Sequence, residues 1–207
     1  AAPIYRMYMT ARKFPYLKDH VVQGTVIFPA AGYAEIAMEV LGPCIEDFII
    51  ERPMTVPVEE KDGLLVVDTI QQGDYVECLS RKEGQIQQPW QLHFRAKKGT
   101  PIPLENSTEN LGELLKKCGK SMNKKTCYKR FDSIGLNYGP QFQCIETMYQ
   151  GDEVSFCILD TSHLKNMDSY LVHPALLDCS LQCVLGAVQS TIHTYLPTGM
   201  NHLQVYD

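Results

Sequence analysis

The segment DHVVQGTVIFPAAGYAEIAMEV, from Asp19 to Val40, joins a polar stretch with a single histidine to an apolar stretch with helical spacing. The apolar side chains occupy the i, i+3, i+4, i+7 and i+8 positions of one helix face, namely Tyr33, Ile36, Ala37, Val40 and Leu41. This pattern predicts a helix with one buried face, which begins after Pro29 and ends at Gly42-Pro43.

The residues after this helix predict strands. The segments LLVVDTI, YVECLS and WQLHFRAK are rich in β-branched, aromatic and other apolar residues, and Gly-containing turns separate them. A polar, proline-containing connector, KKGTPIPLENSTEN, comes next, and we predict a short helix from Leu111 to Cys118. After the Gly/Pro-rich segment GLNYGPQFQCI, the segments ETMYQ and VSFCILD predict two further strands.

A second long helix is predicted in HPALLDCSLQCVLGAV, where Pro174 suits the first turn and the apolar stripe consists of Leu177, Leu181, Val184 and Val188. The final segment, YLPTGMNHLQVYD, is expected to be extended. Each half of the chain therefore starts a long helix with Pro-Ala and places strands around it. We predict an α+β fold of two similar units, 1–99 and 123–207, joined by a connector at 100–122.

The composition of the 207 residues excludes several classes of protein. Hydrophobic residues make up 44% and charged residues 21%, as in ordinary globular proteins, and a net charge of −5 without a basic stripe argues against nucleic-acid binding. No apolar run is long enough to span a membrane. Eight cysteines without a CxxC pair favour reduced, buried thiols in a cytoplasmic protein over disulfides or a metal site.

Basic residues gather between Lys116 and Arg130. The simpler interpretation is that they form the solvated face of a helix or linker. The alternative is a docking patch for an acidic partner.

Two polar side chains interrupt the second predicted helix. Asp178 and Gln182 are four residues apart and so share one face beside the apolar stripe. An acid and an amide in these surroundings are costly to bury unless they are paired, which makes them candidate functional residues. The structural alternative is that Asp178 stabilises the first turn through the helix dipole. His20 differs from the other histidines because Gly24 and Pro29 follow it at fixed offsets.

Four motifs in this order resemble those of one protein family. HVVQGTVIFP fits HxxxGxxxxP, GLNYGPQF contains YGPxF, HPALLDCSLQ fits HPALLDxxxQ, and LPTGMNHLQV looks like LPxxxxxLxV. From about Pro15 to Val205, the chain resembles the dehydratase domains of polyketide synthases and, more distantly, those of animal fatty acid synthases. One such motif alone would be weak evidence, whereas four in sequence order are specific.

The resemblance implies a double hotdog fold, in which each half wraps a curved antiparallel sheet around a central helix. The family's domain continues past the LxV segment, so we expect the second half to be truncated at the C-terminus. His20 and Asp178 would be the catalytic base and acid, facing each other between the halves. The implied substrate-binding residues are Tyr138, Gln182, Gly24, Pro29, Gly139, Pro140 and Phe142.

The implied reaction removes water from a 3-hydroxyacyl thioester and gives the 2,3-enoyl thioester. The imidazole of His20, with an ordinary pKa of ~6.5, would take the proton from the carbon next to the thioester. Asp178, whose pKa an apolar site would raise, would protonate the leaving hydroxyl. The small residues of PAAG leave the amides at the start of the first helix open to the thioester oxygen, and the loop near Gly24 is an equal candidate.

The resemblance implies no bound cofactor, because the substrate would arrive on the phosphopantetheine arm of an acyl carrier protein. An acidic carrier would give the basic residues at 116–130 a partner. The other implied partners are neighbouring ketosynthase, acyltransferase and ketoreductase domains and a second copy of the chain in a homodimeric, cytoplasmic synthase. Neither nucleic acid nor a membrane is expected.

Related double hotdog domains use similar residues for product-template cyclisation, pyran closure or double-bond shifts. The segment FPAAGYAEIAMEV resembles dehydratases more than product-template domains, and double-bond shifters generally lack the Asp. Pyran closure needs the same His and Asp and stays open. A non-catalytic scaffold that binds carrier protein or an acyl chain is the alternative from another class, and the presence of both His20 and Asp178 argues against it.

Overall fold

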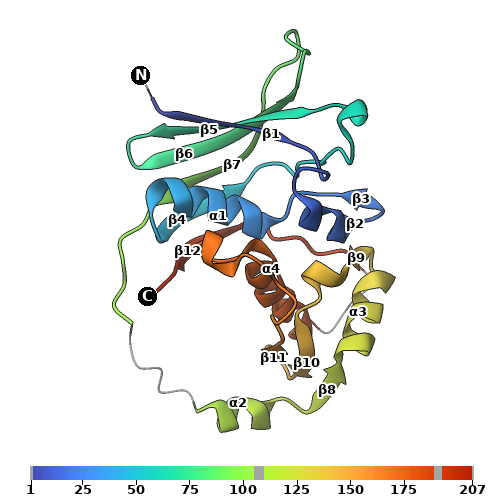
Figure 1. The fold of residues 1–207 in the computed structure, drawn as a ribbon. Helices are drawn as coiled ribbons and strands as arrows, with labels where there is room; N and C mark the ends of the chain where they lie inside the picture. Colours follow the sequence, from blue (N-terminus) through green and yellow to red (C-terminus); the bar gives the residue numbers. More distant parts are fainter. Residues whose placement is uncertain (1, 105–109, 189–192, 207) are drawn as a thin grey trace.

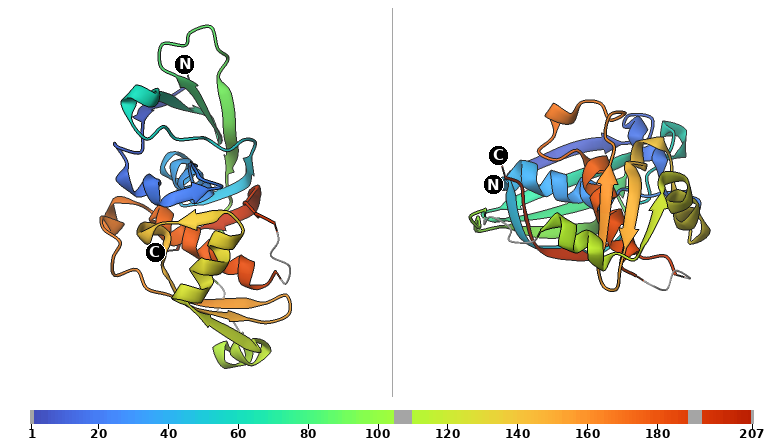
Figure 2. Two further views of the ribbon diagram at one scale, coloured as in Figure 1. Left: turned by 90° about the vertical axis from the view of Figure 1, so that its right-hand side faces the viewer. Right: turned by 90° about the horizontal axis from the view of Figure 1, so that it is seen from below.

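The computed structural model describes residues 2–104, 110–188 and 193–206. Its largest element is a six-stranded antiparallel sheet, which curves around helix α1 (Figures 1 and 2). The strand order is β1-β5-β6-β7-β4-β12. In that order, the strands span Ile4–Met9, Leu65–Gln72, Tyr75–Lys82, Gln91–Lys98, Cys44–Ile50 and Gly199–Gln204.

Helix α1 (Ala30–Leu41) lies at the centre of the first half. The extended residue Pro29 precedes it, and its carbonyl accepts the N–H groups of the first turn. The helix ends at Gly42, which has a φ of +101°, a value that residues with a Cβ rarely adopt. The Pro-to-Gly limits predicted from the sequence are therefore confirmed.

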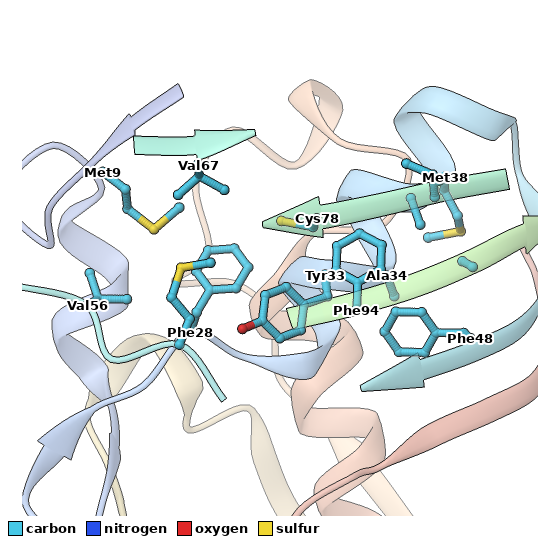
Figure 3. Packing of buried hydrophobic residues seen from close by; sticks show 14 of the residues in the cluster. Met9, Phe28, Tyr33, Ala34, Met38, Phe48, Val56, Val67, Cys78 and Phe94 are labelled. Carbon is cyan, nitrogen blue, oxygen red and sulfur yellow. The ribbon is translucent and has the colours of Figure 1, made fainter. Parts of the chain in front are cut away.

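Aromatic rings fill the space between α1 and the sheet (Figure 3). The ring centroid of Phe94 lies 5.2 Å from that of Tyr33 and 5.6 Å from that of Phe48. These three side chains are fully buried, and burial of a large apolar side chain typically contributes about 1.5–3 kcal/mol. This core fixes α1, and with it the loop that precedes the helix, against a rigid sheet.

The second half is built on a smaller antiparallel sheet of order β11-β10-β8, below the first half in Figure 1. Helix α3 packs against this sheet through Phe131, and helix α4 contacts α1 where the halves meet. Strands β8, β10 and β11 span Lys120–Asn123, Ile145–Gln150 and Ser155–Leu159. Helices α2, α3 and α4 span Leu111–Lys117, Lys124–Ser133 and Pro174–Gln182.

A third sheet, of order β3-β2-β9, joins the two halves. In its antiparallel register His20 lies opposite Tyr138, so two of the sequence motifs are brought into one ladder. Strands β3, β2 and β9 span Thr25–Val26, His20–Val22 and Leu136–Tyr138. Short 3-10 turns span Pro15–Asp19, Glu60–Asp62, Pro140–Phe142, Met167–Ser169 and Cys183–Gly186.

Several elements were not predicted from the sequence. Strands β1 and β4 were missed because each carries charged residues within its apolar pattern. Helix α3 was missed because most of its residues are polar, and its buried face consists only of Cys127, Tyr128 and Phe131. The basic residues at 116–130 lie along α2, β8 and α3. The eight cysteines are free thiols; five are buried as predicted, whereas Cys118, Cys157 and Cys183 are only partly buried.

The second predicted helix needs a correction. Helix α4 ends at Gln182 and continues as a 3-10 turn, and Val184 of the predicted stripe is 60% exposed. The buried face carries Asp178, Cys179 and Gln182 instead. The apolar side chains Leu181 and Val184 line a cavity and do not pack in a core, which explains the difference.

The predicted connector also differs from the structure at its end. Strand β8 begins at Lys120, inside the predicted range 100–122. Strand β12, which belongs by sequence to the second unit, pairs with β4 of the first and extends its sheet. Edge pairing of this kind satisfies backbone groups that would otherwise face solvent, and it joins the two units.

Candidate active site

His20 is the first residue of β2, and its imidazole is almost completely buried. The ring Nδ1 lies 2.7 Å from the carbonyl oxygen of Ile27. Because a carbonyl only accepts hydrogen bonds, the neutral ring carries its proton on Nδ1 and presents Nε2 as the basic atom. The backbone holds the same loop closed, since the Ile27 N–H donates to the His20 carbonyl at 3.1 Å.

Asp178 approaches His20 from the other half of the molecule. Its Oδ1 lies 3.4 Å from His20 Nε2, and the two side chains are 7% and 6% exposed. Helix α4 positions this carboxyl group, and His173 caps the helix by accepting the Ala175 N–H at 3.1 Å. The predicted encounter of an imidazole and a carboxyl group between the halves is therefore present in the structure.

The environment of His20 sets its charge. Burial alone would lower the pKa of the imidazole, but the Asp178 carboxylate and the Ile27 carbonyl outweigh that effect and raise the pKa above its ordinary value. An imidazolium and a carboxylate at this distance stabilise each other. The imidazole of His20 therefore stays protonated to a higher pH than that of an ordinary histidine.

Gln182 orients the carboxyl group. Its amide nitrogen donates to Asp178 Oδ2 at 2.9 Å and to the Phe142 carbonyl at 3.1 Å. Its amide oxygen accepts from the hydroxyl of Tyr128 at 3.0 Å, which in turn accepts the Ile145 N–H at 3.1 Å. With its nitrogen and oxygen both engaged, the amide holds Oδ2 and leaves Oδ1 facing His20.

Tyr138 lies beside the pair. Its ring centroid is 5.7 Å from that of His20, and burial raises the pKa of the phenol well above its ordinary value. The phenol therefore stays protonated and can donate a hydrogen bond at any working pH. Tyr138 and Gln182 both line the cavity described below, and their contact with a substrate stays a prediction.

A cavity of about 300 Å³ opens beside the pair and is lined from both halves. The polar residues of its lining include His20, Tyr138, Asp178 and Gln182. The rest of its wall is mainly apolar and includes Ile27, Phe28, Ile50, Pro53, Leu181 and Leu185. Such a space suits a thin apolar chain with one polar end at the His/Asp pair.

The first turn of α1 borders this cavity through Ala30. The carbonyl of Pro29 accepts the N–H groups of Gly32 and Tyr33, at 2.9 and 3.3 Å. The amides of Ala30 and Ala31 stand too early in the helix to bond to a carbonyl of a preceding turn. Their N–H groups are therefore free to donate to a ligand oxygen at the helix N-terminus. Gly24, the other candidate, is not part of the described lining of this cavity. Its N–H donates instead to the side-chain oxygen of Asn137 at 3.4 Å.

The remaining predicted substrate-binding residues are absent from the described lining of this cavity, namely Gly24, Pro29, Gly139, Pro140 and Phe142. Gly24 forms the β2–β3 turn with a φ of +78°, and Pro29 precedes α1. The assignment of these residues to substrate binding therefore stays a prediction.

The segment from Gly139 to Phe142 supports His20 because Asp19 holds it. The Gly139 N–H donates to the Asp19 carbonyl at 2.8 Å, and the Gln141 N–H donates to its carboxylate at 2.9 Å. The fully buried ring of Phe142 then lies edge-on to the His20 ring, with centroids 5.0 Å apart. This packing places the imidazole on a rigid surface.

Sequence reasoning missed Tyr128, which contacts Gln182 in the site, and Glu35, which lies outside the cavity. Tyr128 comes from α3, a helix that was not predicted, and no motif marks it. Glu35 accepts the N–H groups of Leu171 and Val172 at 2.7 and 3.0 Å and so ties α1 to the segment before α4. An acid within the apolar pattern of the first helix was the available signal, the same one that drew attention to Asp178.

Within residues 2–104, 110–188 and 193–206, no group of three or more His, Cys, Asp or Glu side chains could hold a metal ion. In the same ranges, no helix combines the length and apolar character needed to cross a membrane.

Two family models match the chain. The model described as polyketide synthase dehydratase domain matches residues 1–78, and the model described as polyketide synthase dehydratase N-terminal domain matches residues 107–207. Among curated proteins, polyketide synthase GfsA of Streptomyces halstedii is 30% identical over 184 residues, which is 82% of this chain and 2% of that protein. The chain thus spans a small part of the length of such relatives.

Solved structures show the same fold. The dehydratase domain from the CurK module of curacin polyketide synthase matches with a TM-score of 0.83 and 26% identity, over 99% of this chain and 77% of that one. An inactive Asp-to-Asn mutant of the CurK dehydratase matches with a TM-score of 0.83 at 26% identity, over 98% and 77%. An inactive His-to-Phe mutant matches with a TM-score of 0.82 at 28% identity, over 99% and 76%. The predicted double hotdog class is confirmed.

Proposed function

Because this chain belongs to the polyketide synthase dehydratase family, we propose that it removes water from a 3-hydroxyacyl thioester, with His20 as base and Asp178 as acid. One observation carries this assignment of roles. His20 Nε2 and Asp178 Oδ1 lie 3.4 Å apart, buried between the two halves and beside a largely apolar cavity. The inactive mutants of the similar CurK dehydratase, in which an Asp and a His are replaced, support it.

In the proposed reaction, His20 Nε2 takes the proton from the α-carbon, and the electron pair of that C–H bond forms the new double bond. The bond from the β-carbon to its hydroxyl breaks, and the hydroxyl leaves as water with the proton of Asp178. Because the resting pair carries its proton on His20, that proton first crosses the 3.4 Å gap to Asp178, which gives the reactive form. After the reaction His20 again holds a proton and Asp178 is a carboxylate, so the resting state is restored.

Negative charge develops on the thioester oxygen during α-proton removal. The amides of Ala30 and Ala31 at the start of α1 are the donors we assign to it, because Ala30 lines the cavity and later amides of the turn bond to Pro29. Donors already aimed at the developing charge typically contribute about 2.7–4 kcal/mol of transition-state stabilisation. Tyr138 and Gln182 would hold the hydroxyl end.

We further propose that the substrate arrives on the phosphopantetheine arm of an acyl carrier protein, without a bound cofactor. The exposed residues Lys116, Lys117 and Lys120 favour an acidic carrier as partner. The curated relatives are polyketide synthases much longer than this chain, which supports neighbouring synthase domains, and a second copy, as further partners.

Mass spectrometry with a 3-hydroxyacyl thioester tests the proposal. The protein should give a product lighter by one water, and the rate should fall by about 10²–10⁴ in His20→Ala and in Asp178→Asn. Asp160→Asn is the matched control, because Asp160 is an exposed aspartate at the end of β11 and should leave the rate unchanged.

A substrate that binds but keeps its mass would contradict the proposal and favour the non-catalytic scaffold. A product that loses water and then cyclises at constant mass would favour pyran closure, and NMR of the product would identify the ring.

A further inference from the structure

His173 is the last residue before α4 and caps the start of that helix. Its Nδ1 accepts the N–H of Ala175 at 3.1 Å, and its backbone carbonyl accepts the N–H of Leu177 at 3.1 Å. Pro174 has no N–H group, so the Ala175 amide is the first helical donor that needs an acceptor. A ring nitrogen that accepts a hydrogen bond carries no proton. The capping ring is therefore neutral, with its proton on Nε2.

A row of aromatic rings connects His173 with the other half of the site. The His173 ring is buried, and its centroid lies 6.1 Å from that of Tyr16. Tyr16 stacks on Phe142 at 6.2 Å, and Phe142 lies edge-on to His20 at 5.0 Å. His173 thus supports Asp178 through the helix and His20 through the rings, although it is not part of the described cavity lining.

The surroundings of His173 favour the neutral ring. Burial lowers the pKa of the imidazole, and the neighbouring imidazole of His163 lowers it further. The phenols of Tyr16 and Tyr170 pack against the ring, and the carboxyl group of Glu35 accepts the two backbone N–H groups just before it. A proton on Nδ1 would set one N–H against another and would place positive charge at the positive end of the helix dipole.

We infer that His173 is a positioning residue of the reaction, whose neutral ring holds the start of α4 and thereby the orientation of Asp178. This inference rests on the proposed function and adds an acid-sensitive element to it. Protonation of Nδ1 removes the acceptor of the Ala175 N–H, and the first turn of α4 then frays. Asp178 is only three residues beyond that amide, so the carboxyl group loses its fixed place opposite His20.

Two substitutions separate the cap from its titration. His173→Leu removes the acceptor, whereas His173→Asn supplies one that does not titrate. Asparagine already caps α2 in this way, because the side chain of Asn110 accepts the N–H of Gly112, two residues further on, at 2.8 Å. In the full protein that contains this chain, acting on a 3-hydroxyacyl thioester, His173→Leu should lower kcat about five- to thirtyfold with little change in KM. His173→Asn should recover most of that loss.

The pH dependence of kcat separates this role from a purely structural one. On the acid side, the wild type should lose activity through one more ionisation than His173→Asn, because only the wild type can protonate its cap. Hydrogen exchange followed by mass spectrometry gives a readout without substrate. At one pH, the amides of residues 175–182 should exchange faster in His173→Leu than in the wild type.

Asn110→Leu is the matched control, because it removes the same kind of cap from α2 and should leave kcat and its pH dependence unchanged. Wild-type kcat in His173→Leu would overturn the inference, and so would an equal loss in His173→Asn or an acid limb in His173→Asn identical to that of the wild type. If the wild type dehydrates no thioester, the proposed function fails, and hydrogen exchange then decides by itself whether His173 holds α4.

Discussion

Gln182 and Asp178 are joined by a hydrogen bond of 2.9 Å between the amide nitrogen and Oδ2, one helical turn apart on α4. Tyr128 completes this network. Its hydroxyl donates to the Gln182 amide oxygen at 3.0 Å, and the amide nitrogen is thereby turned toward Asp178. The carboxyl group is consequently oriented before any substrate binds. Its other oxygen is the one that meets His20.

Replacement of Gln182 by leucine keeps the volume and removes the donor. We expect kcat to fall by about 10–100-fold with a smaller change in KM, because the carboxyl group can then rotate away from the reacting hydroxyl. Steady-state kinetics measure both constants. Tyr128→Phe should give a smaller loss, since Gln182 still bonds to Phe142. A Gln182→Leu enzyme with wild-type kcat would remove Gln182 from the orienting role.

The titration of His20 should depend on Asp178. Burial lowers the pKa of the imidazole and Asp178 raises it, with a net increase in the native protein. In Asp178→Asn the carboxylate that opposes burial most strongly is gone and the Ile27 carbonyl remains, so the His20 pKa should fall from its raised value. NMR titration of the imidazole measures the shift, and an unchanged pKa would contradict the contact.

The same raised pKa has a consequence for activity and stability. The working pair holds one proton, so kcat/KM should decline on the alkaline side only as the pH rises through the raised pKa of His20.

The pair stabilises the fold fully below the unfolded pKa of ~6.5, and this contribution to the free energy of unfolding is lost as the pH rises through the folded pKa of His20. Denaturation of Asp178→Asn at several pH values should lack that decline.

Gly139 should not tolerate a side chain. A Cβ at this position would meet the Asp19 carboxylate, which holds the segment behind His20. Gly139→Ala should therefore destabilise the protein by about 1–3 kcal/mol in chemical denaturation and should also lower activity. Gly119→Ala is the control, because nothing lies within 4 Å of a Cβ there and its φ is not positive. Equal effects of the two substitutions would contradict this prediction.

Glu35 should make the free energy of unfolding decline as the pH rises, whereas a carboxyl group whose pKa is lowered by folding has the opposite effect. Burial raises the pKa of its carboxyl group, although the N–H groups of Val172 and Leu171 partly oppose the increase. The folded state therefore binds the proton more tightly than the unfolded state, and stability declines as the pH rises through this range.

Glu35→Gln should remove that decline, so the wild type's advantage in free energy of unfolding should shrink as the pH is raised. Glu146→Gln, at an exposed position on β10, is the control and should leave the pH dependence unchanged. A constant difference between wild type and Glu35→Gln would contradict the assigned pKa direction.

His20 and Asp178 could be identified from the sequence because each belongs to a motif of fixed spacing, and the structure brings both to one cavity. The motif YGPQF, by contrast, did not indicate which of its side chains reaches the cavity. Tyr138 reaches the cavity, whereas Phe142 packs against the His20 ring, and the difference depends on the hydrogen bonds that Asp19 accepts from Gly139 and Gln141.

The sequence by itself determined the limits of α1, the strands β5 to β7 and the start of α4, because helical periodicity, alternation and Pro or Gly punctuation act within a few residues. Only the tertiary structure decided that Tyr128 supports Gln182 and that Glu35 ties α1 to the segment before α4. Those relationships depend on contacts between elements distant in the chain. They arise from close packing and hydrogen-bond satisfaction in three dimensions, for which local spacing carries no signal.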